Sequence, residues 1–147
     1  MERTQNQNIR LRWLSSLFEF GHIEFQRKLW FAKYPKLVGD YGESLCKYFD
    51  DLDLDDGYKD FLLEEIISEK EFKVIEDFHE NLRNYSLRPE KRNLSDKKIL
   101  RDPEWINLTL VAKQNWEELK KMISDKIELK EISEWENLLN SSNKNKF

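Results

Sequence analysis

The spacing of the large apolar residues restricts this chain to an all-α fold more strongly than any other feature of its sequence. Leucine, isoleucine and aromatic residues recur every three or four positions through most of the 147 residues. That spacing puts them on one face of an α-helix, whereas a half-buried strand alternates apolar with polar residues. No segment combines such alternation with β-branched residues, and the nearest candidate, 108–111, lies inside a helical pattern.

Glycine and proline divide this pattern into segments. The chain has only four glycines and three prolines, and they fall at the edges of the apolar-periodic segments. Because both residues interrupt helices, this placement favours helices joined by short connections. A length of 147 residues with 13% aromatic residues is enough to build one core. We therefore expect a single-domain, all-α bundle of six to eight helices over residues 1–140, followed by a polar tail at 141–147.

Seven segments carry a helical apolar stripe. They cover residues 9–21, 23–34, 40–52, 58–66, 68–85, 102–123 and 132–139. Between the fifth and the sixth of them, the polar stretch 86–95 contains a proline and is predicted to be the longest loop. A short turn around residues 99 and 100 is expected to follow it.

Three of these segments begin with capping signals. The clearest is Ser68, which is followed three residues later by Glu71, the pattern of a reciprocal capping box. Asp40 begins the third segment in the same way with an aspartate. Asp102 followed by Pro103 is typical of an N-cap and a first helical residue, since proline there loses no hydrogen bond.

Charge is distributed very unevenly along the chain. Fifteen of the 29 acidic residues lie in residues 40–80 beside only four lysines, which gives this segment a net charge of −11. Residues 1–39 and 81–126 each carry a net charge of +4, so the overall −4 conceals a polarised molecule. A concentrated negative surface attracts basic proteins or cations and repels nucleic acid. The sequence therefore predicts a basic protein partner and no nucleic acid.

The densest acids form an aspartate run at residues 50–56, which first suggests a calcium loop. An EF-hand loop requires glycine at its sixth position and a bidentate glutamate at its twelfth. In the frame that begins at Asp51, the sixth position is Asp56, the glycine comes one place late, and the twelfth is Leu62. The frame that puts Gly57 at the sixth position puts Leu52 and Leu54 at ligand positions. The spacing therefore does not fit an EF-hand calcium site in either frame.

Two interpretations of the aspartate run remain open. It can be a solvated helix end in which Leu52 and Leu54 anchor the loop to the core, or it can be a contact site for a partner. Acids at the C-terminal end of a helix oppose its dipole and repel one another, which favours neutralisation by a partner. The candidate contact has its centre at Asp50, Asp51, Asp53, Asp55 and Asp56, with a rim at Asp60, Glu64 and Glu65.

Motifs for catalysis or metal binding are scarce. The sequence has no HExxH, no CxxC, no glycine-rich phosphate loop and no nucleophile elbow. Glu76 and His79 match the Glu-x-x-His spacing of di-iron bundles once, and such sites need it on two helices. His79 is better explained as a packed, hydrogen-bonded residue. We expect no enzyme, no cofactor and no metal; an enzyme would require a concave pocket lined by carboxylates or by His79.

The remaining features concern location and packing. No apolar run reaches 18 residues, and no secretory signal pattern begins the chain, so a cytoplasmic protein is expected. Cys46 is the single cysteine and is expected to be a small buried residue in a reducing compartment. The five tryptophans have the spacing of core residues, although one of them, if exposed, would make a strong interface anchor. The basic residues at 88–101 are expected to pair with the acidic segment of the same molecule or of another copy.

Three short motifs together resemble a known class of proteins. They are the segment from Gln26 to Trp30, the Phe49-Asp50-Asp51 triplet, and the segment from Asp102 to Trp105. This arrangement is similar to small bacterial all-helical immunity proteins of contact-dependent growth inhibition and related toxin systems. The resemblance implies a cytoplasmic protein that neutralises one cognate toxin, and a nuclease with a basic cleft would suit an acidic inhibitor. We expect a monomer or weak homodimer that does not bind membranes. The alternative is a helical adaptor or regulatory subunit for another basic protein.

Overall fold

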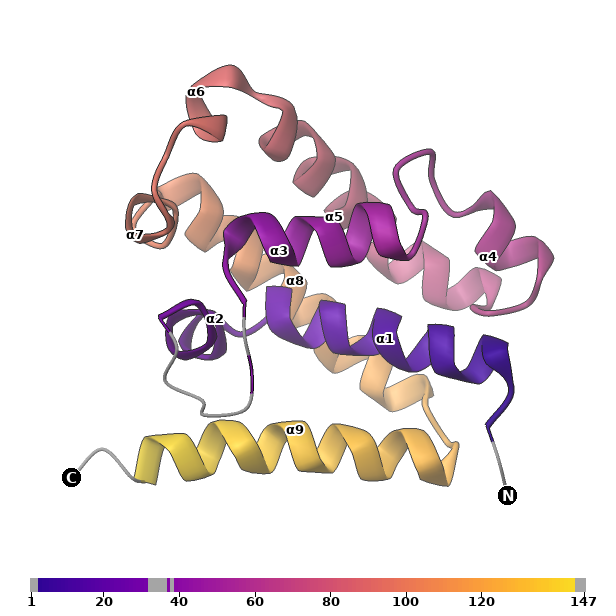
Figure 1. The fold of residues 1–147 in the computed structure, drawn as a ribbon. Helices are drawn as coiled ribbons and strands as arrows, with labels where there is room; N and C mark the ends of the chain where they lie inside the picture. The colour runs from indigo at the N-terminus through magenta and orange to yellow at the C-terminus, as the bar shows by residue number, and fades with distance from the viewer. Residues whose placement is uncertain (1–2, 32–36, 38, 145–147) are drawn as a thin grey trace.

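The computed structural model describes residues 3–31, 37 and 39–144, and all regular structure within them is helical (Figure 1). The elements, in chain order, are α1 (Gln5–Phe20), α2 (Ile23–Trp30), α3 (Tyr41–Leu45), the π-helix η1 (Cys46–Asp51), α4 (Lys59–Leu63), α5 (Glu69–Leu87), α6 (Pro89–Arg92), α7 (Asp96–Ile99), α8 (Pro103–Met122) and α9 (Lys126–Lys144). The all-α prediction is confirmed. Nine α-helices in these residues exceed the expected six to eight.

Most of the excess comes from the stretch predicted as a long loop. Residues 86–95 instead contain the end of α5 and the whole of α6, and α7 follows immediately. Pro89 occupies the first turn of α6, where its fixed φ suits a helix. The hydroxyl of Ser95 accepts a hydrogen bond from the Lys98 amide at 3.3 Å and so starts α7. One-turn helices have no apolar stripe, so periodicity could not reveal them.

Other boundaries also differ from the sequence prediction. α1 begins at Gln5 rather than near residue 9, because Thr4 and Gln7 form a reciprocal capping box in a polar stretch. α9 continues to Lys144 and so enters the predicted tail. α2 ends at Trp30; the part of the second predicted helix at residues 32–34 lies outside the described residues.

The predicted caps are confirmed. The Ser68 hydroxyl accepts from the Glu71 amide at 3.1 Å, and the Glu71 carboxylate accepts from the Ser68 amide at 2.8 Å. Asp40 accepts from the Glu43 amide at 2.7 Å. The Asp102 carboxylate accepts a hydrogen bond from the Glu104 amide at the start of α8, which carries proline in its first turn. These short side chains satisfy amides that a helix leaves unpaired, which is why their sequence signals are reliable.

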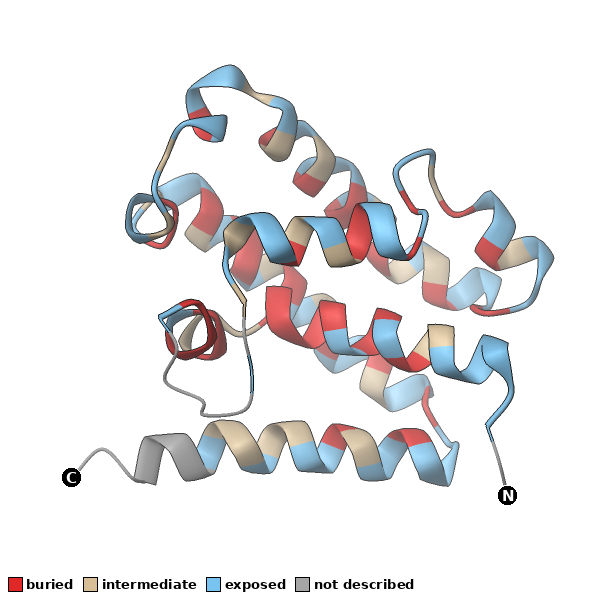
Figure 2. Ribbon diagram, in the orientation of Figure 1, coloured by how far each residue is buried: buried red, intermediate tan, exposed pale blue. Residues whose placement is uncertain are grey.

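Helix α8 is the centre of the packing and contacts both α5 and α1. α9 runs along α1 on one side of the molecule, and the inward faces of the helices carry the buried residues (Figure 2). One hydrophobic cluster draws buried residues from α1, α2, η1, α4, α5, α7, α8 and α9, among them the fully buried Trp13, Trp105 and Trp116. Trp30 is also buried and Trp135 is partly buried, so the prediction that the tryptophans form the core is confirmed.

Two of the motifs that carried the resemblance meet in this core. Trp105 Nε1 donates to Gln26 Oε1 at 2.9 Å, and Gln26 Nε2 donates to the carbonyl groups of Glu19 and Phe20 at the end of α1. Trp30 Nε1 donates to the buried Glu19 carboxylate at 3.1 Å. Gln26 therefore joins α1, α2 and α8, and both motifs have a structural role.

Candidate protein-binding surface

All eight acids of the predicted contact are exposed. They lie at the end of η1, in the loop that follows it, and on or directly after α4, on the right-hand side of the molecule in Figure 1. The acids are Asp50, Asp51, Asp53, Asp55, Asp56, Asp60, Glu64 and Glu65. We call the residues 50–56 the aspartate turn and these eight side chains the acidic surface.

A helix-ending hydrogen-bond pattern gives the aspartate turn its shape. The Leu54 amide donates to the Phe49 carbonyl at 3.0 Å, and the Asp53 amide donates to the Asp50 carbonyl at 3.1 Å. This is a Schellman motif, in which the residue after the cap adopts a left-handed conformation. Asp53 has a φ of 55°, a conformation for which glycine is usual. The sequence did not reveal this turn, because it has no glycine at that place.

Apolar side chains hold the turn against the core. Leu52 and Leu54 are 5% and 0% exposed, while the aspartates between and around them face solvent. The expectation that the two leucines anchor the loop is therefore confirmed. Tyr58 is also buried and fixes the other end of the turn.

A chain of buried hydrogen bonds lies beneath the turn. Trp13 Nε1 donates to the Tyr58 hydroxyl at 2.8 Å, the two hydroxyls of Tyr58 and Tyr48 are 2.5 Å apart, and the Tyr48 hydroxyl is 2.8 Å from His79 Nδ1. Every member is satisfied when Tyr58 donates to Tyr48 and Tyr48 donates to a neutral His79. Burial lowers the pKa of His79, which favours that neutral state. His79 is thus the packed, hydrogen-bonded residue that its sequence position indicated.

A second Schellman motif follows α4. The Ile66 amide donates to the Phe61 carbonyl at 2.8 Å, and Glu65 has a φ of 57°. In this short helix Leu63 is 71% exposed and is followed directly by two acids. An exposed leucine among acids is a residue that the sequence prediction missed. The signal was the Leu62-Leu63 pair, because adjacent residues on a helix cannot both face the core.

The acidic surface has little internal neutralisation. Within the described residues, only Asp55 forms an ion pair, with Arg83 Nη1 at 3.3 Å, and its side chain is 63% exposed. A pair so exposed contributes little stability. The prediction that the basic residues at 88–101 pair with the acidic segment is wrong for Arg88 and Lys91. They pair instead with nearby acids: Glu90, Asp102 and Glu104.

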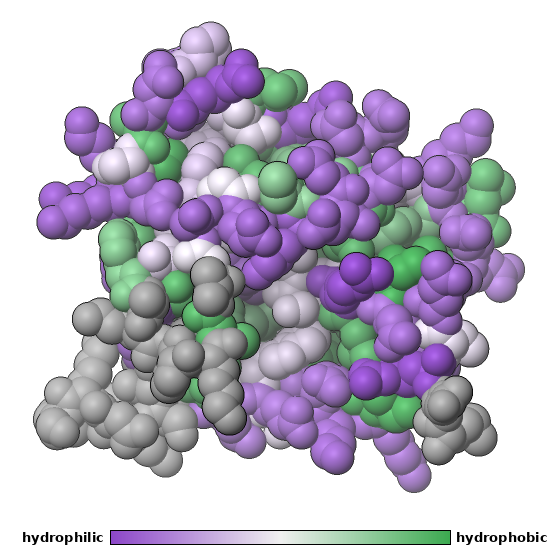
Figure 3. All heavy atoms as spheres, viewed as in Figure 1, coloured by the Kyte–Doolittle hydropathy of each residue, from purple (hydrophilic) through white to green (hydrophobic). Residues whose placement is uncertain are grey.

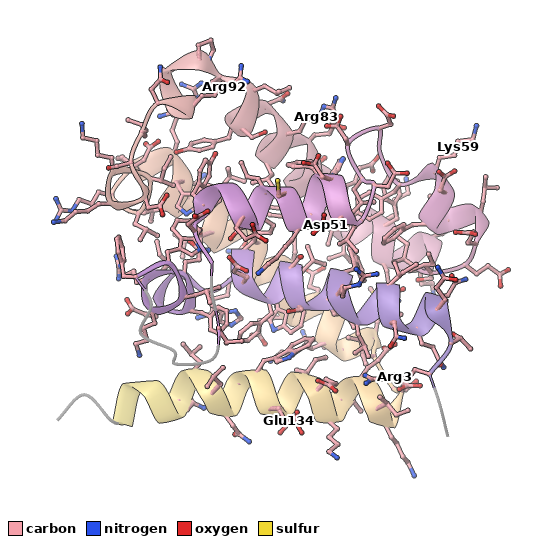
Figure 4. The ribbon with its side chains drawn as sticks, viewed as in Figure 1. Arg3, Asp51, Lys59, Arg83, Arg92 and Glu134 are labelled. Carbon is pink, nitrogen blue, oxygen red and sulfur yellow. The ribbon has the colours of Figure 1, made fainter. Side chains whose placement is uncertain are left out.

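The helices α6 and α7, which carry most of the basic residues at 88–101, lie away from the acidic surface (Figure 1). Arg92 is found at the α6 end of the molecule, opposite to Lys59 of α4 (Figure 4). α5, a helix of 19 residues, separates the two ends in the chain. Local pairing within α6 and the start of α8 therefore prevails over pairing with the distant aspartates.

Cys46 corrects another expectation, because it is exposed rather than buried. Its Sγ atom lies 3.3 Å from the Asp50 carboxylate, which raises the pKa of the thiol through that hydrogen bond. The two residues are four apart and share the outward face, while Tyr48 and Phe49 turn inward. The apolar residues next to Cys46 in the sequence led to the wrong prediction that it lies on the buried face of the helix.

A groove of about 910 Å³ lies between the α4–α5 turn, the α8–α9 turn and Arg10 of α1. Carboxylates line it, as the enzyme alternative requires, but His79 does not. Glu71 and Glu128 in the groove are both bound by Arg10. Burial alone would raise the pKa of Glu71, but hydrogen bonds from Arg10 and Ser68 lower it overall, which does not suit a general acid.

The described part of the chain has neither a cluster of metal ligands nor a membrane-spanning helix. No three His, Cys, Asp or Glu side chains gather there as a metal site would require. None of the helices there is sufficiently long and apolar to traverse a lipid bilayer. Comparisons of the chain with protein families, curated proteins and solved structures find no match.

Proposed function

We propose that this chain is a cytoplasmic immunity-type protein that binds and neutralises one cognate bacterial toxin with a basic, nuclease-type surface. The main support is that eight acids are exposed on firmly anchored elements, and only one of them has a cationic partner among the described residues. The protein acts as a monomer or weak homodimer and occludes the active or functional surface of the toxin.

Electrostatics explains how such a surface would work. Uncompensated acids on one side of a protein accelerate its encounter with a basic surface and discriminate against acidic ones. Leu63 supplies an apolar contact next to Glu64 and Glu65. An apolar anchor with a charged rim is the usual arrangement of a protein interface.

The alternative is a helical adaptor or regulatory subunit that binds a different basic protein through the same surface. Growth rescue distinguishes the two functions. Co-expression with a toxin domain encoded beside this chain should restore growth if the chain is an immunity protein. An adaptor would leave the toxin active.

The double reversal Asp51→Lys and Asp56→Lys tests the contact itself. Both side chains are exposed, and neither forms an ion pair within the described residues, so the fold should persist. We expect growth rescue to be lost and the affinity for the toxin to fall at least about a hundredfold, chiefly at low salt. Surface plasmon resonance at several salt concentrations measures both effects.

The matched control is Glu118→Lys with Glu134→Lys, which changes net charge equally on exposed sites of α8 and α9. The control should bind the toxin with nearly unchanged affinity. Equal loss in both double variants would show that only net charge matters. Unchanged affinity in the Asp51 and Asp56 variant would place the contact elsewhere.

A further inference from the structure

The groove described above has a firm base and an open rim. Its base is the Arg10 guanidinium, which donates to Glu71, Glu128 and the Ile66 carbonyl at 2.6–3.0 Å. These bonds fix α1, α5, α9 and the α4–α5 turn relative to one another. In Figure 1 the two turns and the N-terminal half of α1 lie at the same end of the molecule. The groove is therefore built by several elements that hold one another in place.

Its walls are apolar and acidic. Ile66, Ile67, Met122 and Ile123 line it, and of these four only Met122 is exposed. Met122 is 44% exposed, a high value for a large apolar side chain. Figure 3 shows apolar atoms on the right-hand part of the visible face, around α4 and along α1, among polar ones.

The charge of the groove selects the sign of its occupant. Five carboxylates and two cations line it. Arg10 and its two carboxylates satisfy one another. This leaves Glu65, Glu69 and Asp125 against Lys70, and none of these four forms an ion pair within the described residues. The available charge is thus negative, beside the exposed side chain of Met122.

We propose that this groove binds a cationic amphipathic segment of a partner protein. Its apolar side chains would contact Met122, and its lysine or arginine side chains would pair with Glu65, Glu69 and Asp125. A polypeptide suits the site better than a small molecule. Two exposed apolar side chains follow lining residues in the chain, Leu63 after Leu62 and Ile127 after Asp125, and a polypeptide is long enough to reach beyond the groove toward them.

This surface is separate from the aspartate turn, although Glu65 belongs to both. The groove is tested with a synthetic peptide and the aspartate turn with the toxin. Failure of one proposal therefore leaves the other standing. The probe is a short peptide of leucine and lysine in helical register. The control peptide has glutamate in place of every lysine.

The chain offers a sensitive reporter, because it contains only two methionines, Met1 and Met122. With ¹³C-methyl methionine, the lysine peptide should shift the Met122 signal in a saturable way, with a Kd below about 1 mM. The glutamate peptide supplies the control. An unmoved Met122 signal at that concentration overturns the proposal.

Two variants then locate the binding energy by calorimetry. Met122→Lys adds a positive charge and removes an apolar contact in the groove, and should weaken the lysine peptide at least about tenfold. Leu110→Lys makes the same kind of change on the same helix at a site 55% exposed outside the groove, and should leave affinity unchanged. Equal effects of the two variants, or equal binding of both peptides, would also overturn the proposal.

Discussion

Single residues in left-handed backbone conformation shape the acidic surface. Asp53 and Glu65 each follow the end of a helix with a φ near 55°, where glycine avoids the steric cost of a side chain. Aspartate tolerates this conformation through its short polar side chain, whereas glutamate lacks that advantage. The chain thus has an acid at two positions where glycine is the usual residue, and both acids belong to the acidic surface.

The first residue-scale prediction concerns Glu65. Glu65→Gly should raise the free energy of unfolding by about 0.5–1 kcal/mol, because it removes the left-handed strain and retains the backbone bonds of the turn. Urea denaturation followed by circular dichroism measures the change. Glu64→Gly is the control: with a φ of −89° it has no such strain and should lose stability. A loss in Glu65→Gly would show that its side chain stabilises the fold.

At the scale of elements, side-chain bonds between helices decide how the short elements are placed. Gln26 joins α1, α2 and α8, while Arg10 joins α1 to α5, α9 and the α4–α5 turn. Arg10 also lies 5.7 Å from the ring centre of Trp13. Elements as short as α4 and η1 have only one and two buried side chains of their own, so they also depend on such bonds and on anchors such as Tyr58.

Replacement of Arg10 tests this dependence. Arg10→Met would leave Glu71 and Glu128 without their cation at a site where the arginine is 17% exposed, and should cost about 2–4 kcal/mol of stability. Arg12→Met is the matched control, since Arg12 is exposed on the same helix, and it should stay within about 0.5 kcal/mol. Thermal and urea unfolding provide both values. A similar small loss in the two variants would show that the network adds little.

For the whole molecule, burial of the two histidines couples stability to pH. Burial lowers the pKa of both His22 and His79 from its usual 6.5. The unfolded chain then binds more protons than the folded chain below about pH 6.5, so stability is full above that pH and falls as the pH drops. Burial raises the pKa of Glu19, and its contribution runs the opposite way, being lost as pH rises through its folded pKa.

His79→Gln isolates one part of this behaviour. The wild-type protein should lose up to about 1.4 kcal/mol per pH unit through His79 as pH falls below 6.5, in addition to the effect of His22. Protonated His79 would also reverse the bond to Tyr48 and leave the buried Tyr58 hydroxyl without an acceptor. The variant should show a shallower pH dependence between pH 5 and 7 in urea unfolding. Equal slopes would exclude His79 as a source.

Local signals in the sequence were sufficient for much of the fold. The apolar stripes placed the long helices, and Ser68, Asp40 and Asp102 marked three of their starts, because a cap is a bond between residues near in the chain. The exposure of the eight acids could also be predicted from the sequence, because charged side chains favour contact with water. These features depend on residues within about one helical turn of one another, so they can be predicted from the sequence alone.

Tertiary structure alone decided the rest. Periodicity could not show that Cys46 faces solvent, that Arg88 and Lys91 pair with acids close by, or that Leu63 remains uncovered. Arg10 and its two carboxylates are 61 and 118 residues apart in the chain, and the groove exists only after they meet. The sequence determined which segments form the long helices and where negative charge accumulates. Three-dimensional packing determined which acids are neutralised and which stay available, because pairing depends on distances that only the assembled helices define.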